Sequence, residues 1–239
     1  MQHRIQKARL SLAAIAVTAL FSTGARADLT PLDQVDFSGT GLGAVNTILT
    51  IQSPGSTSTE TGSVAWNGSA DVLSGDTKTG ASQTLTRTLG DLGVLSADSL
   101  RVVFNASEPG NGDNGITLNS LTFSAYAPTT GSLIFSASLL APIDYADTFT
   151  GAGNSGFVFG LTTSQAAAFT AAVTASGFSF DSLRAGLSAS ASNATGGNET
   201  FFIADAGGPI AAVPEPQTYA LLMAGLAGIG FVARRRRSD

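Results

Sequence analysis

The residues that could carry chemistry in this chain of 239 residues are few, and nearly all of them are carboxylates. There is no cysteine, the single histidine is His3, and Lys78 is the only lysine between residues 28 and 212. A Ser-His-Asp triad, a Cys-His pair and a zinc ion held by histidine are therefore excluded from that segment. A glycosidase built on two carboxylates remains open, but aromatic residues that could line a sugar cleft are scarce. We therefore expect a protein that is not an enzyme.

One turn rich in acidic and amide side chains could instead bind a metal ion. Four of its side chains offer the oxygen ligands that calcium prefers, namely Glu108, Asn111, Asp113 and Asn114. Their spacing does not match that of an EF-hand loop, and Asn, Asp and Gly are also typical of plain turns. The turn is therefore a candidate calcium site, and we expect no other cofactor.

Trp66, the only tryptophan, is the candidate for contact with a glycan. Its indole ring could stack on a sugar, but a tryptophan at the end of an alternating strand belongs more often to the core. Asp144 and Asp147 form a further acidic pair. Because they are three residues apart, a spacing that suits neither face of a strand, we predict an exposed loop there.

The distribution of charge bears on the partners of the protein. Residues 28–212 contain 4 basic and 15 acidic residues, which gives this segment a net charge of −11. Such a surface is repelled by phosphate backbones and gains nothing from counterion release. We therefore expect no nucleic-acid partner.

Residues 1–27 have the three-part order of a secretory signal peptide. A basic stretch precedes an apolar run over residues 10–21, and small residues follow it. Ala25 and Ala27 occupy the positions that signal peptidase reads, so cleavage is predicted before Asp28. The apolar run is too short for a bilayer core of about 30 Å, which needs about 20 residues. Signal peptidase and the general secretion machinery are thus expected partners.

Residues 213–239 form a second signal with three parts. It begins with Val213, Pro214, Glu215 and Pro216, and it closes on Arg234, Arg235, Arg236 and Arg237. The prolines favour an extended segment, and the apolar run over residues 219–232 is predicted to enter the bilayer as a transmembrane helix. By the positive-inside rule the arginines stay cytoplasmic. An ordinary single-pass tail anchor would share the last two parts.

With all three parts in this order, the segment closely resembles the PEP-CTERM sorting signal of Gram-negative bacteria. The resemblance covers the last 27 residues. It implies that exosortase, a membrane-embedded transpeptidase-like enzyme, recognises the Pro-Glu-Pro region and removes the tail. It also implies a transient stay in the inner membrane, followed by transfer to the cell surface or extracellular matrix. The family is associated with exopolysaccharide production and with biofilm or floc formation.

Between the two signals, alternation of apolar and polar residues is the recurring pattern. It predicts strands over residues 44–52, 84–89, 100–105, 116–126, 132–140, 157–161, 178–180, 187–191 and 200–203. Residues 44–52 would place Leu49 and Ile51 on a buried face, and residues 84–89 would bury Leu85 and Leu89 rather than the threonines. In residues 116–126 the apolar phase shifts near Asn119, as a β-bulge would produce.

One segment departs from this alternation. Residues 163–176 are rich in alanine, open with a possible N-cap at Thr163 or Ser164, and stop at Gly177. We predict a single helix packed on a sheet face. Residues 28–212 would then form one domain, a mainly β passenger with a jelly-roll-like β-sandwich and one short helix. Two functions fit: a non-catalytic exported surface or matrix protein, and a secreted glycan-binding module that could depend on calcium.

Overall fold

The computed structural model describes residues 25–36, 46–53, 57–80, 83–107, 115–145 and 155–205. Its strands are β1 (Ala25–Asp36), β2 (Thr47–Ile51), β3 (Thr59–Trp66), β4 (Asp71–Gly75), β5 (Arg87–Thr88), β6 (Leu100–Ala106), β7 (Ile116–Tyr126), β8 (Leu133–Leu139), β9 (Ile143–Tyr145), β10 (Ser155–Gly160), β11 (Arg184–Ser192) and β12 (Glu199–Asp205). A helix, α1 (Thr163–Ser176), and a 3-10 turn at Phe180–Ser182 complete the described elements. The mainly β class predicted from the sequence is confirmed.

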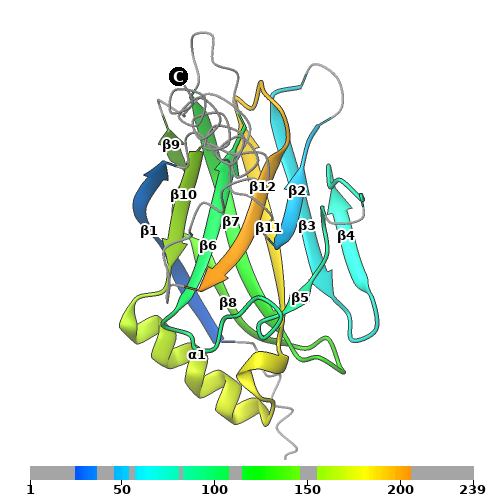
Figure 1. The fold of residues 1–239 in the computed structure, drawn as a ribbon, viewed down its shortest axis with the longest axis vertical. Coiled ribbons are helices and arrows are strands. Elements are labelled where there is room, and N and C mark those ends of the chain that lie inside the picture. Colours follow the sequence, from blue (N-terminus) through cyan, green and yellow to red (C-terminus); the bar gives the residue numbers. More distant parts are fainter. Residues whose placement is uncertain are drawn as a thin grey trace, which may run out of the picture.

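Hydrogen bonds join the strands into one sheet in the order β2-β12-β6-β10-β1-β8-β7-β11-β3-β4, with β5 beside β11 and β9 beside β7 (Figure 1). The sheet is nearly closed, because β2 at one end of this order contacts β3 near the other end. Strand β1 lies between β10 and β8 in this order and joins the strands on its two sides. Its first five residues pair with β8 in parallel, and Thr30 to Asp36 pair with β10 in antiparallel. A jelly roll is antiparallel, so this parallel pair is a departure from that plan, and the sandwich assignment stays a prediction.

Apolar side chains from both halves of the sheet meet in one core, which is rich in phenylalanine. Phe104, Phe123, Phe135, Phe159, Phe169 and Phe201 are among its fully buried members. On β7 the buried and solvent-facing residues alternate, and the alternation changes phase at Asn119 and Ser120. There the pairing with β11 skips Asn119. The predicted β-bulge is therefore confirmed, and it keeps both ends of this long strand facing the core.

Helix α1 has the predicted bounds and ends at Gly177, which adopts the left-handed conformation with φ of 76°. The N-cap is Thr162, not Thr163 or Ser164 as the sequence suggested. Thr162 and Gln165 form a capping box, in which each side chain accepts a hydrogen bond from the backbone N–H of the other. Figure 1 shows that α1 lies across one end of the sheet rather than along a face.

Two of the predicted strand faces are only partly right. In β2, Ile48 and Thr50 are buried together with Leu49 and Ile51, because residues 83–85 run alongside and bond to this strand. In the segment 84–89, Leu89 is buried as predicted, but Thr84 and Thr86 are buried as well and Leu85 is only half-buried. The hydroxyl of Thr84 bonds to the backbone N–H of Thr50, so a polar side chain is satisfied inside the fold.

Three short elements also differ from the sequence predictions. Residues 178–180, predicted as a strand, lead into the 3-10 turn. Asp144, predicted in a loop, lies in β9, which pairs with the start of β7. Asp147 lies outside the described residues. Strand β4 was not predicted at all, because Asp71–Gly75 offers only two apolar residues.

Strand β1 begins upstream of the predicted signal-peptide cleavage point. Ala25 and Ala27 pair with Phe135 and Ala137 of β8, and Asp28 pairs with Ser138. Cleavage before Asp28 would therefore leave two of the five described residue pairs between β1 and β8. In the described part of the chain, no helix has the length and hydropathy needed to cross a bilayer. The predicted transmembrane segment, residues 219–232, lies outside the described residues.

Candidate functional site

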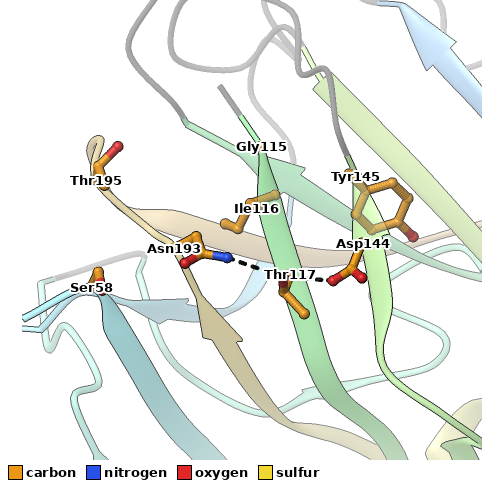
Figure 2. Close-up of a pocket in the computed structure, with 8 residues that line it drawn as sticks. All are labelled: Ser58, Gly115, Ile116, Thr117, Asp144, Tyr145, Asn193 and Thr195. Atoms are coloured by element: carbon orange, nitrogen blue, oxygen red, sulfur yellow. Dashed lines mark hydrogen bonds between the residues drawn. The ribbon is translucent and has the colours of Figure 1, made fainter. Parts of the chain in front are cut away.

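The end of the sheet opposite α1 carries an open, polar pocket of about 610 Å³ (Figure 2). Its lining consists of Ser58, Gly115, Ile116, Thr117, Asp144, Tyr145, Asn193 and Thr195. These residues come from the start of β3, the start of β7, strand β9 and the turn after β11. The sheet pairing brings them together around Thr117 of β7. Thr117 pairs with Asp144 of β9 on one side and with Ser192 of β11 on the other.

A chain of hydrogen bonds orders the polar side chains of this pocket. The Asn193 amide donates to the Thr117 hydroxyl over 3.2 Å, and that hydroxyl donates to an Asp144 carboxylate oxygen over 2.7 Å (Figure 2). Asn193 has a φ of 62°, a left-handed conformation that asparagine adopts more readily than most residues. Asp144 is exposed, so its remaining acceptor capacity faces solvent. The arrangement presents a fixed carboxylate and an amide to a polar ligand.

Tyr145 provides the aromatic wall of the same pocket. Its ring stacks on Phe157 with centroids 3.6 Å apart and tilts toward Phe104 at 6.4 Å. Burial of the phenol raises the pKa of Tyr145 to about 12. The hydroxyl therefore stays protonated at neutral pH and is not a general base there. It can donate or accept a hydrogen bond at the pocket wall.

Trp66, the predicted glycan contact, lies at the other end of the sheet. Its indole N–H donates to the carbonyl of Pro128 over 2.8 Å, and the Arg184 guanidinium carbon lies 4.0 Å from the ring centroid. Thr86 holds that guanidinium through two hydrogen bonds. One ring face of the half-buried Trp66 and its only hydrogen-bond donor, the indole N–H, are thus occupied by contacts within the protein. Stacking on a sugar stays a prediction and would require the opposite face.

The candidate calcium turn is not among the residues that the structure describes. Glu108, Asn111, Asp113 and Asn114 lie outside the described residues. Within the described ranges, no group of three or more His, Cys, Asp or Glu side chains is placed to hold a metal ion. Sequence reasoning missed the pocket residues Thr117 and Asn193. The carboxylate of Asp144 was noticed, but only the pairing of β7 with both β9 and β11 places it beside these two residues.

The residues of the predicted sorting signal also lie outside the described part of the chain, and comparison with protein families identifies them. No curated protein and no solved structure matches the chain. The family model described as the PEP-CTERM protein-sorting motif matches residues 212–237, which include the Pro-Glu-Pro triplet, the apolar run and the four arginines. The motif implies that exosortase processes the protein and that it is exported. The chain thus carries a PEP-CTERM protein-sorting motif at residues 212–237, behind a mainly β region.

Proposed function

We propose that the protein is a non-catalytic component of the cell surface or extracellular matrix, associated with exopolysaccharide or biofilm. The observation that carries this proposal is the PEP-CTERM motif at residues 212–237. The passenger in front of it has no cysteine and no histidine between residues 28 and 212, which limits the chemistry open to it. Signal peptidase and exosortase would process the two ends, with the apolar run 219–232 held in the inner membrane between the two events.

The directions of β1 and β12 support this role. The start of β1 and the end of β12, which connect to the two signals, both lie on the α1 side of the sheet. Strand β1 starts where Ala25 pairs with Phe135, whose ring stacks on Phe169 of α1. Strand β12 ends where Asp205 pairs with Leu100, close to Asp98, which lines a surface pocket together with residues of α1. The membrane tether therefore begins at the α1 end, and the polar pocket lies at the opposite end.

The length of the linker strengthens this orientation. Eight residues, 206–213, separate β12 from Pro214, and fully extended they reach at most about 28 Å. The eleven residues of β7 alone span about 37 Å. During sorting, the pocket end would thus face away from the membrane, toward the polysaccharide layer.

Variants of the tail test the sorting step. Glu215→Ala should leave the full-length protein in the membrane with its tail intact, because recognition is lost while anchoring is kept. Replacing Arg234, Arg235, Arg236 and Arg237 with serine should let unprocessed protein leave the membrane, since the charge cost that stops translocation is gone. Membrane fractionation and an antibody to the passenger would follow each variant.

Gln217→Ala is the matched control for these tail variants, because it lies next to the Pro-Glu-Pro triplet but outside it. It should be processed and exported like the parent. If Glu215→Ala and the serine variant are also processed like the parent, sorting by exosortase is wrong for this chain.

A second candidate function, binding of a glycan, is favoured by the pocket around Asp144. An exposed carboxylate, an amide fixed by Thr117 and a tyrosine wall offer the acceptors, donors and apolar surface that sugars use in shallow sites. Asp144→Ala should then weaken retention on exopolysaccharide from the host about tenfold, the loss expected for one charge-assisted hydrogen bond.

Comparison of three variants locates this binding. Asp98→Ala removes the same charge from an exposed position beside α1 and should bind like the parent. Trp66→Ala tests the glycan contact predicted from the sequence alone. Loss of retention in Trp66→Ala but not in Asp144→Ala would place the glycan site at the α1 end. If the parent protein is not retained at all, glycan binding is wrong and only the structural role remains.

A further inference from the structure

Two glutamates occupy inward-facing positions where the core meets the open end of the sheet. On β3 the buried row is Glu60, Gly62 and Val64, and on β12 it starts with Glu199. Glu60 is 3% exposed and Glu199 is fully buried. Both strands adjoin Ile51, which pairs with Glu199 and would contact a side chain placed at Gly62. Burial of a carboxylate is costly unless hydrogen bonds or an opposite charge compensate it.

The carboxylate of Glu60 is only half compensated. Its Oε1 accepts a hydrogen bond from the backbone N–H of Ser53 over 3.1 Å. Its Oε2 is buried and has no hydrogen-bond partner among the described residues. Glu199 is not free, since it makes an interaction of its own. The unsatisfied group is therefore Oε2 of Glu60.

Glu60 is one of the residues that line a second pocket at the open end, with a volume of about 270 Å³. The pocket is lined by Gln52, Ser53, Thr57, Ser58, Glu60, Ala194, Thr195 and Gly196. Five of these residues carry a neutral oxygen in the side chain. The Ser53 hydroxyl donates to the carbonyl of Thr57, which leaves its lone pairs available. One buried carboxylate among neutral oxygens is a donor set for a hard cation.

We propose that this pocket binds a calcium ion, with Oε2 of Glu60 as its charged ligand. Calcium accepts irregular sets of hydroxyl, amide and carbonyl oxygens, whereas magnesium demands a near-octahedral set and gives up its waters reluctantly. With Glu60 as the only acidic lining residue, affinity falls in the range of extracellular modules, a Kd of about 10⁻⁴–10⁻³ M. None of its described lining residues belongs to the turn containing Asp113, and the proposal stands whether or not the proposed matrix role holds.

The test measures the melting temperature of the full chain, purified in mild detergent, in calcium, in magnesium and in EDTA. Calcium at about 10 mM should raise the melting temperature by about 3–6 °C over EDTA, as expected for a ligand at about ten times its Kd. Magnesium at the same concentration should raise it much less. Glu60→Gln keeps an acceptor for the Ser53 N–H but removes the charge, and it should reduce the calcium shift to about 1 °C, which corresponds to an affinity about tenfold weaker.

Two control variants locate the ion. Asp144→Asn removes the same charge from the neighbouring pocket, and Asp113→Asn removes it from the turn predicted from the sequence. Both should keep the calcium shift of the parent. No calcium shift in the parent would overturn the proposal. A shift that survives Glu60→Gln but is lost in Asp113→Asn or Asp144→Asn would also overturn it, because the ion would then be bound elsewhere.

Hydrogen exchange gives an answer that needs no variant, in case Glu60→Gln does not fold. The backbone amides of Ser53 and Ala194 lie at the pocket and bond to Glu60 and to the carbonyl of Ser58. Calcium, but not magnesium, should slow their exchange severalfold in the parent protein. Protection confined to other regions of the chain would count against the site.

Discussion

The two ends of the nearly closed sheet differ in what fills them. At one end α1 covers the opening, and Phe169 stacks on Phe135 with centroids 4.3 Å apart and meets Phe123 edge-on at 5.9 Å. At the other end no described helix covers the strand ends, and two polar pockets lie side by side, sharing Ser58 and Thr195. One end of the sheet is thus closed by aromatic packing, and the other end is open and lined by polar side chains.

This difference separates the residues that stabilise the sheet from the polar residues that are open to solvent. Close aromatic packing contributes strongly to stability and tolerates little change. Exposed polar side chains such as Asp144 contribute little to stability, so they are free to serve a ligand. In the orientation proposed above, the stable end would face the membrane tether and the polar end would face outward.

The largest effect is expected from removal of the helix anchor. Phe169→Ala should lower the free energy of unfolding by about 3–5 kcal/mol, because it deletes a fully buried ring and leaves a cavity between α1 and the sheet. Urea unfolding followed by circular dichroism would measure the loss. Leu140→Ala is the matched control, since Leu140 follows β8 and is 78% exposed, and its cost should stay within about 0.5 kcal/mol. Equal costs for the two variants would contradict the comparison of the ends.

A smaller effect is expected at the start of the same helix. Thr162→Ala removes the side chain that caps the N–H of Gln165 and should cost about 1 kcal/mol. Thr163→Ala, one residue later, leaves this capping box intact and should be close to neutral. A larger loss in Thr163→Ala than in Thr162→Ala would return the cap to the position suggested by the sequence.

Much of the fold could be predicted from short stretches of the sequence. The helix over residues 163–176 and the bulge at Asn119 could be predicted because each depends on a few neighbouring residues: an alanine-rich run that ends in glycine, and a single phase shift in one strand. The face of residues 84–89 could not be predicted. Thr84 and Thr86 are buried because Thr50 and Arg184, distant in sequence, satisfy their hydroxyls.

The site was less accessible to sequence reasoning than the fold. Asp144 was visible as a carboxylate, but its neighbours Thr117 and Asn193 join it only through β7, which pairs with both β9 and β11. Glu60 carried no signal, because an acidic residue in an alternating strand is expected to face solvent. Its burial follows from the register of β3, which places it in the same row as Gly62 and Val64.

The smallest effect at neutral pH concerns Tyr145, which joins the polar pocket to the aromatic core. Tyr145→Phe keeps the ring that stacks on Phe157, so its unfolding free energy below pH 10 should be close to that of the parent. Burial raises the pKa of Tyr145 from 10.0 to about 12 in the folded protein. Above pH 10 the unfolded chain therefore loses this proton while the folded chain retains it, and folding stability falls as pH rises toward 12. Urea midpoints at about pH 9, 10 and 11 should show the parent losing stability relative to Tyr145→Phe, because the variant has no phenol to titrate. Parallel curves for the two proteins would mean that the phenol is as well solvated in the folded state as in the unfolded chain, and the pocket wall would then be open to water.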